Sequence, residues 1–280
     1  MIKLVLTDLD ATLIASQDNR VVSQRSLDAI ATAIDAGVHV GPVTGRTPAG
    51  VAEAFPNNPQ AYATGAFANG ALVLLDGEVI HRAVTSPEAL QRVADTLDDL
   101  GEGVLTIYDI EGDRGTWFVS GTPERIEPSS DHGACITEVR PRVEEPALKA
   151  NVHMKVSRER LVEVRDMLRE QVPELDFVFP SATMPLIDIL PAGYGKGDAV
   201  AVMADALGIG IDEVATFGDS ENDLSMLEAV PNSVAVSNAT PDAARAARWH
   251  IGHADDYAVA DALIDIAKAT AAGEMPSFMR

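Results

Sequence analysis

The sequence is poor in cysteine and in positive charge. Its single cysteine, Cys135, cannot form a disulfide within the chain, which favours a reducing compartment such as the cytoplasm. His132 lies near Cys135, but two residues do not make a metal site, so we interpret Cys135 as a packed or incidental thiol. Lysine and arginine number 21 against 43 aspartates and glutamates, which argues against a surface that binds nucleic acid or an anionic membrane.

A long hydrophobic run is also missing. No stretch of 18 or more apolar residues occurs, so we expect no membrane-spanning helix. The first residues lead directly into a strand with an acidic end, which does not resemble a signal peptide. With 280 residues, 46% of them hydrophobic, the chain can form one large domain or two smaller ones.

Two carboxylates end the first predicted strand. The apolar run 2–6 is typical of a strand buried on both faces, and Asp8 and Asp10 follow it. Ligands of open α/β sheets bind beyond the carboxyl ends of such strands. Alternation would put Asp8 and Asp10 on one side, where they repel each other unless a cation lies between them. The residues allow either a Mg²⁺ site with an aspartate nucleophile or a strand end with two solvated acids.

A second strand end offers a hydroxyl group. The predicted strand 38–43 is followed by Thr44, Gly45 and Arg46 and then by a predicted helix over 49–55. A hydroxyl and free backbone N–H groups before a helix can bind an anion. A plain strand-to-helix turn would show the same pattern.

Two more motifs lie near the end of the chain. Lys196, one of only five lysines, begins a predicted helix over 196–207, and its charge there opposes the helix dipole. The glycines around it do not fit a Walker loop, because Gly197 stands where that loop needs serine or threonine. This placement favours anion binding. A predicted strand over 214–217 precedes Asp219 and Asp223, so that a short apolar run again stops at carboxylates.

The remaining helix and strand patterns indicate two parts: a middle block, and an outer part whose sequence lies on both sides of it. An α/β pattern covers residues 1–82 and 191–280, and residues 83–190 read as an inserted α+β domain. Residues after Gly273 are expected to be loose. Further helices are predicted over 26–36, 88–100, 158–171, 242–247 and 255–270, and further strands over 61–64, 72–75, 78–82, 104–108, 116–120, 152–156, 175–179, 186–190 and 233–236.

Taken in order, these strand and helix ends resemble the four motifs of the haloacid dehalogenase (HAD) superfamily of phosphohydrolases. The inserted block is placed and sized like the type IIB cap of the Cof-type branch, and the segments 69–71 and 238–239 are similar to that branch. The resemblance covers essentially the whole chain. It implies a Rossmann-like HAD core with a parallel sheet plus an inserted α+β cap domain.

The resemblance also implies a mechanism. Asp8 would attack phosphorus and form a phosphoaspartate, and Asp10 would act as general acid and then general base. Mg²⁺ would be held by the Asp8 carboxylate, the Asp10 carbonyl and Asp219, with Asp223 as an orienting residue or extra ligand. The positive field of Mg²⁺ would then offset the acidic charge of the chain.

Other positions would contact the substrate, by the same resemblance. Thr44 and Lys196 would bind phosphoryl oxygens, and Gly45, Arg46 and Asn222 would assist. Asn69 and Asp188 are further candidates near the substrate, although an acid such as Asp188 can simply end a strand. The implied partner is a small phosphorylated metabolite, with sugar phosphates first. A sugar phosphomutase and a non-catalytic, ligand-binding relic of the fold are the alternatives.

One position departs from the family pattern. Ala11 stands where the family usually has glycine, a residue that often marks a positive φ. The neighbouring motif residues are all retained. We therefore predict that Ala11 has a negative φ and points its methyl group away from the metal.

Overall fold

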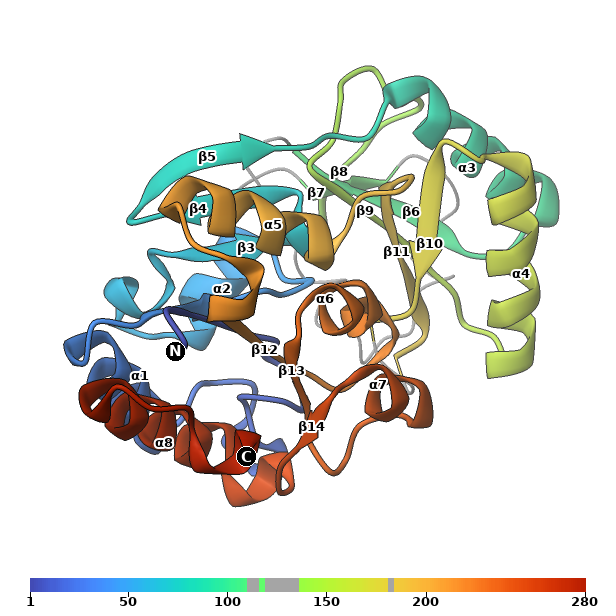
Figure 1. Cartoon of the computed structure of the whole chain (residues 1–280). Coiled ribbons are helices and arrows are strands. Elements are labelled where there is room, and N and C mark those ends of the chain that lie inside the picture. Colours follow the sequence, from blue (N-terminus) through green and yellow to red (C-terminus); the bar gives the residue numbers. More distant parts are fainter. Residues whose placement is uncertain (110–115, 119–135, 181–183) are drawn as a thin grey trace. The chain divides into compact units, whose positions relative to one another are not determined.

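The computed structural model describes residues 1–109, 116–118, 136–180 and 184–280 (Figure 1). Contacts divide the chain into two units. The core unit comprises residues 1–81 and 195–280, and the inserted unit comprises residues 82–194.

A five-stranded parallel sheet organises the core unit, in the order β14-β13-β12-β1-β2. Every residue of β1 and β12 is buried, as expected for apolar strands covered on both faces. The parallel sheet expected from the sequence is confirmed. Its strands are β1 (Leu4–Thr7), β2 (His39–Pro42), β12 (Val214–Gly218), β13 (Asn232–Ala235) and β14 (Trp249–His250).

Three helices of the core unit begin at hydroxyl caps. The side chains of Ser23, Thr47 and Thr240 each accept a hydrogen bond from a backbone N–H three residues further on, which starts α1, α2 and α7. Helices α1 and α8 lie side by side (Figure 1). The helices are α1 (Gln24–Asp35), α2 (Pro48–Ala54), α5 (Lys196–Leu207), α6 (Leu224–Ala229), α7 (Pro241–Ala246) and α8 (Ala258–Ala272).

A small three-stranded sheet completes the core unit, in the order β3 (Gly65–Phe67), β4 (Leu72–Leu75) and β5 (Glu78–Arg82). The strand predicted over 61–64 is wrong, because Pro59–Tyr62 forms a 3-10 helix. Proline is well suited to the first position of such a helix. The strand forms only where β4 supplies a pairing partner.

The inserted unit is a mixed sheet in the order β10-β11-β9-β6-β7-β8, with helices α3 (Pro87–Leu100) and α4 (Arg158–Gln171). Its strand pairs are antiparallel except for β7 with β8. This architecture confirms the expected α+β class. The strands are β6 (Val104–Tyr108), β7 (Thr116–Phe118), β8 (Ile136–Val139), β9 (Lys149–His153), β10 (Leu175–Val178) and β11 (Leu186–Pro191).

The end of the chain is packed. After Gly273 the chain forms a 3-10 helix over Ser277–Met279, in which Met279 is only 5% exposed. The ring centroid of Phe278 lies 6.3 Å from that of Phe217 in β12. The expectation of a loose terminus is therefore wrong, because these apolar side chains gain burial against the sheet.

Some further expectations differ from the structure or lie outside it. Strand β9 starts three residues before the strand predicted over 152–156, and α6 and β14 were not predicted. Residues 119–120, His132 and Cys135 lie outside the described residues. Within the described ranges, no helix has the length and apolar character needed to cross a bilayer.

Candidate active site

The site begins where two neighbouring parallel strands end. Asp8 directly follows β1, and its backbone N–H donates to the carbonyl of Phe217 at 2.9 Å. Asp219 directly follows β12, the strand paired with β1. Because parallel strands end at the same edge of a sheet, two acids far apart in the sequence come together there.

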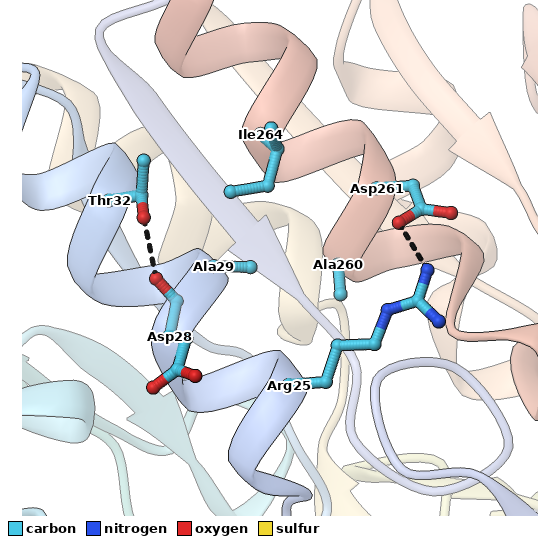
Figure 2. A pocket seen from close by; sticks show the side chains of 7 residues that line it. All are labelled: Arg25, Asp28, Ala29, Thr32, Ala260, Asp261 and Ile264. Carbon is cyan, nitrogen blue, oxygen red and sulfur yellow. Dashed lines mark hydrogen bonds and ion pairs between the residues drawn. The ribbon is translucent and has the colours of Figure 1, made fainter.

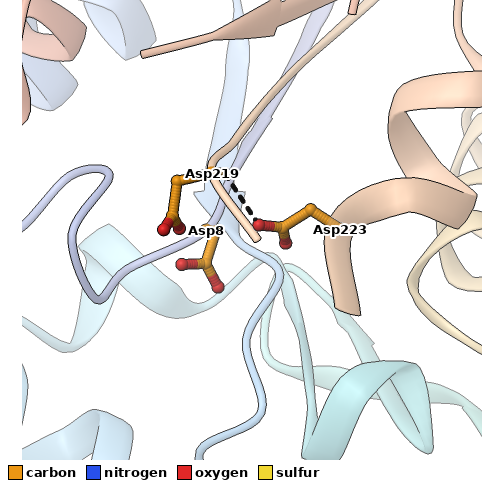
Figure 3. Close-up of side chains that lie close together, drawn as sticks. All are labelled: Asp8, Asp219 and Asp223. Carbon is orange, nitrogen blue, oxygen red and sulfur yellow. Dashed lines mark hydrogen bonds between the residues drawn. The ribbon is translucent and has the colours of Figure 1, made fainter. Parts of the chain in front are cut away.

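Asp223 completes a group of three buried carboxylates with Asp8 and Asp219 (Figure 3). One oxygen from each lies within 4.8 Å of the others, a spacing that could hold a metal ion. Oδ2 of Asp223 accepts hydrogen bonds from the backbone N–H groups of Asp219 at 2.9 Å and Ser220 at 3.0 Å. The turn after β12 thus aims its second acid back at the end of its own strand.

Lys196 ties this group together. Its Nζ donates to Oδ1 of Asp8 at 2.6 Å and to Oδ1 of Asp223 at 2.5 Å, and its side chain is completely buried. The helix that carries it comes close to α6, because a Cβ on Gly197 would lie 2.5 Å from the carbonyl oxygen of Ser225. Glycine at this position therefore allows the approach that brings Lys196 to the acids.

The buried charges perturb one another. Burial is the main cause that raises the pKa of Asp8 to about 7, while the Lys196 ammonium lowers it and the charge of Asp223 adds to the rise. Burial, followed by the charges of Asp223 and Asp8, raises the pKa of Asp219 to about 8. Burial alone would lower the pKa of Lys196, but the charges of Asp223 and Asp8 outweigh it and raise that pKa above its ordinary value. When ionised, the three acids and one lysine carry an excess of two negative charges.

Hydroxyl groups flank the carboxylates. Oγ1 of Thr12 donates to Oδ1 of Asp219 at 3.1 Å, a contact that the sequence did not single out. Thr44 is buried just beyond β2, the other neighbour of β1, and its backbone N–H donates to the carbonyl of Ala66 at 2.9 Å. Gly45 follows it. The predicted hydroxyl therefore lies at the same sheet edge as Asp8.

Asp10 and Arg46 form a separate pair. Nε of Arg46 donates to Oδ2 of Asp10 at 2.9 Å, and its terminal nitrogen donates to Oδ1 at 2.5 Å. The Asp10 side chain is 52% exposed, and its carboxylate is not part of the buried group. The charge of Asp10 is among the causes that raise the pKa of Asp8, as expected for two neighbouring acids, and Arg46 is the ion-pair partner of Asp10.

Asn222 belongs to the same turn as Asp223. Its Nδ2 donates to Oδ1 of Asn69 at 3.0 Å, and its Oδ1 accepts from the hydroxyl of Ser220 at 3.0 Å. Asn69 is buried and adopts a left-handed backbone conformation with φ 55°. An amide–amide hydrogen bond thereby joins the turn between β3 and β4 to the turn before α6.

Ala11 has a φ of 60°, so the prediction of a negative φ is wrong. The turn after Asp10 is tight, with the N–H groups of Thr12 and Ile14 both bonded to the carbonyl of Leu9. Nδ2 of Asn238 donates to the Ala11 carbonyl at 2.7 Å. These contacts hold alanine in a conformation that costs it about 1–2 kcal/mol. Ala11 itself is exposed, whereas the three carboxylates are buried.

A pocket of about 400 Å³ lies between α1 and α8 (Figure 2). Its cationic side chain, Arg25, is paired with Asp261 at 2.6 Å, and Asp28 adds a second acid. A pocket with this charge balance repels phosphate. The acidic group of Asp8 is therefore the better candidate for the active site.

Comparison with known proteins decides the family. Residues 5–263 match the haloacid dehalogenase-like hydrolases. The chain belongs to this family. Hydrolase activity, which the sequence analysis expects, is the activity of this family.

Named relatives extend over most of the chain. YxeH of Bacillus subtilis (strain 168), named only provisionally as a phosphatase, is 27% identical over 279 residues, 95% of this chain and 98% of that protein. The HMP-PP phosphatase of Klebsiella pneumoniae (strain 342) is 28% identical over 168 residues, 60% of each chain. The solved structure of the HAD subclass IIB sugar phosphatase BT4131 has a TM-score of 0.77 at 18% identity and covers 93% of this chain and 97% of that one, which shows a shared fold.

Proposed function

We propose that this HAD hydrolase is a Mg²⁺-dependent phosphatase of small phosphorylated metabolites, with sugar phosphates as the first substrate class. The observation that carries the proposal is the buried group of Asp8, Asp219 and Asp223 bridged by Lys196. The named functions of similar proteins, an HMP-PP phosphatase and a sugar phosphatase, support it. The single cysteine supports a cytoplasmic setting.

A divalent cation suits this group. The excess of two negative charges matches the charge of Mg²⁺, and carboxylate oxygens are the ligands that this ion prefers. The side chains of Asp8, Asp219 and Asp223 and the backbone carbonyl of Asp10 would hold it. When bound, Mg²⁺ would neutralise the charge that keeps an anionic phosphate away from an anionic nucleophile.

In the proposed first step, a carboxylate oxygen of Asp8 forms a bond to phosphorus while the bond from phosphorus to the alcohol oxygen breaks. Asp10 gives its proton to that leaving oxygen. In the second step, water attacks phosphorus and loses a proton to Asp10, and the bond between Asp8 and phosphorus breaks. Phosphate leaves, and both acids return to their starting states.

Arg46 has a supporting part in this proposal. Its two hydrogen bonds fix the orientation of the Asp10 carboxylate, which is the group that must meet the leaving oxygen. Thr44, Gly45, Lys196 and Asn222 would bind the phosphoryl oxygens through a hydroxyl, backbone N–H groups, an ammonium and an amide. Such donors stabilise the charge that spreads over the transferred phosphoryl group.

A screen tests this function directly. The purified protein is assayed for release of inorganic phosphate from sugar phosphates, nucleotides and vitamin phosphates, with Mg²⁺ or with EDTA. We expect Mg²⁺-dependent release from at least one sugar phosphate, and none from the Asp8→Asn variant. Isomerised sugar phosphate without free phosphate would indicate a mutase instead, and activity that persists in EDTA would refute the role of the acidic group.

A further inference from the structure

One loop of the core unit contacts both turns that lead away from the acidic group. Residues 236–240, which we call the β13 loop, directly follow β13. The backbone N–H of Thr240 donates to the carbonyl of Asp219 at 2.8 Å. The side chain of Asn238 reaches the turn after β1, where its Nδ2 donates to the carbonyl of Ala11 at 2.7 Å. The β13 loop therefore holds the turn after β1 and the turn after β12 at once.

Both ends of the Asn238 amide have a partner. Besides the donation to Ala11, Oδ1 of Asn238 accepts a hydrogen bond from the backbone N–H of Ala254 at 2.9 Å. Ala254 starts the 3-10 helix Ala254–Asp256. Because a carbonyl only accepts and a backbone N–H only donates, a single orientation of the amide satisfies both contacts. The side chain that holds the Ala11 carbonyl is thus itself fixed at its other end.

The turn that Asn238 contacts is strained. Ala11 has a φ of 60°, a conformation that glycine adopts readily and alanine rarely. The N–H groups of Thr12 and Ile14 bond to the carbonyl of Leu9 within the same turn, whereas Asn238 ties the turn to a separate part of the core unit. Because the peptide group between Ala11 and Thr12 is planar, a hydrogen bond to its carbonyl also fixes where Thr12 begins.

Thr12 connects this turn to the acidic group. Its side chain is buried, and its Oγ1 donates to Oδ1 of Asp219 at 3.1 Å. On the other side of Ala11, the carbonyl of Asp10 is the backbone ligand of Mg²⁺ in the proposed function. A shift of the turn would therefore move two groups that face the metal position. Mg²⁺ demands nearly ideal octahedral geometry, so we expect such a shift to weaken its binding.

We propose that Asn238 is a positioning residue of the metal site. It holds the Ala11 turn, and through that turn the Asp10 carbonyl and the Thr12 hydroxyl, in the geometry that binds Mg²⁺. Its effect on Mg²⁺ rests on the proposed function. Residues that orient the ligands of a metal, without binding it, typically change metal affinity about 10–100-fold when they are replaced.

Asn238→Asp is the central variant. It keeps the size of the side chain and the acceptor oxygen, but replaces the donor to the Ala11 carbonyl with a second oxygen, which repels that carbonyl. The matched control is Asn232→Asp at the first residue of β13, where Nδ2 donates to the carbonyls of Asp212 at 2.8 Å and Val214 at 3.1 Å. Both variants add an acid and remove an amide donor, but Asn232 lies at the opposite end of β13 from the β13 loop.

The Kd of Mg²⁺ is measured without turnover, from the rise of the melting temperature with Mg²⁺ concentration. Asn238→Asp is expected to raise this Kd about tenfold or more, and Asn232→Asp to leave it unchanged even where it lowers the melting temperature. An added negative charge alone would tighten the binding of a cation, so the direction separates positioning from charge. Asn238→Ala, which adds no charge, is expected to raise the Kd as well and replaces the aspartate variant if that one does not fold.

A double-mutant cycle tests the route through Ala11. Glycine takes a positive φ without strain, so the turn of the Ala11→Gly variant depends less on Asn238. Asn238→Ala is therefore expected to raise the Kd of Mg²⁺ by a smaller factor in the Ala11→Gly background than in the wild type. If the contact served only the stability of the loop, the two factors would be equal.

The outcomes separate this proposal from the proposed function. Equal Kd values in the wild type and both Asn238 variants, or equal factors in the cycle, overturn the positioning role even if the protein is an active phosphatase. A wild type that hydrolyses no phosphate ester overturns the proposed function. In that case a Kd raised by the Asn238 variants, but not by Asn232→Asp, still supports the positioning role.

Discussion

Asp219→Asn is expected to stabilise the metal-free protein while it removes metal binding. The Asp219 carboxyl is buried, and its pKa rises from 3.8 to about 8 because burial and the charges of Asp223 and Asp8 oppose ionisation. Asparagine keeps the shape and still accepts the hydrogen bond from Thr12, but it carries no charge. The variant therefore removes a buried charge that only a cation would compensate.

The direction of the pH dependence follows from the raised pKa. The folded state holds the Asp219 proton more tightly than the unfolded state, so its favourable contribution is complete below pH 3.8 and is lost as pH rises through about 8. One unit corresponds to about 1.4 kcal/mol. Because nearby acids share the proton and water relaxes around the new charge, we expect about 2 kcal/mol of the wild type's stability to be lost between pH 5 and pH 8 through this group.

Urea denaturation followed by circular dichroism measures these differences. In EDTA, Asp219→Asn is expected to match the wild type at pH 5 and to exceed its free energy of unfolding by about 2 kcal/mol at pH 8. Mg²⁺ at about 100 times its Kd adds about 2.7 kcal/mol to the wild type alone, so the order reverses. Asp205→Asn, which removes an exposed acid from α5, controls for the general effect of lowering the net charge. The reasoning is refuted if Asp219→Asn is less stable than the wild type at pH 8 in EDTA.

The remaining predictions concern activity and the neighbouring residues. Asp8→Asn removes the nucleophile and should abolish phosphate release with the fold intact by circular dichroism; turnover within tenfold of the wild type would exclude the covalent step. Ca²⁺ should block the Mg²⁺-dependent assay, because it prefers more ligands and looser geometry; equal rates with both ions would contradict this. Ala11→Gly should raise thermal stability or leave it unchanged, because it relieves the strain of φ 60°, and should change kcat less than tenfold. Arg46→Met should lower kcat tenfold or more, since it removes the two hydrogen bonds that orient the Asp10 carboxylate; an unchanged kcat would separate Arg46 from the role of Asp10.

Local patterns in the sequence were enough for most of the elements. Helices over 158–171 and 196–207 have the predicted bounds, because apolar spacing and a stop residue act within one helix. The bounds predicted for β9 were wrong. The polar residues Lys149, Asn151 and His153 alternate with apolar residues in this strand, so it lacks the continuous apolar run that was used to recognise buried strands. The segment 61–64 was misread because pairing with β4, rather than local propensity, decides where β3 starts.

The site shows the same division between local and tertiary information. The acids at Asp8 and Asp219 could be identified from the sequence, because a buried strand that stops at a carboxylate is a local signal. The pairing of Arg46 with Asp10 could not, because 36 residues separate them and only the adjacent ends of β1 and β2 bring them together.

The sequence by itself determined the motif ends, the parallel α/β class and the family resemblance, all of which depend on residue type and spacing along the chain. Tertiary structure alone decided that Lys196 lies between Asp8 and Asp223, that Ala11 takes a positive φ and that Arg46 pairs with Asp10. Each of these depends on where separate strands and helices meet. Burial and the distances between such elements set the pKa values of Asp8 and Asp219 and the backbone conformation of Ala11, and no single segment contains that information.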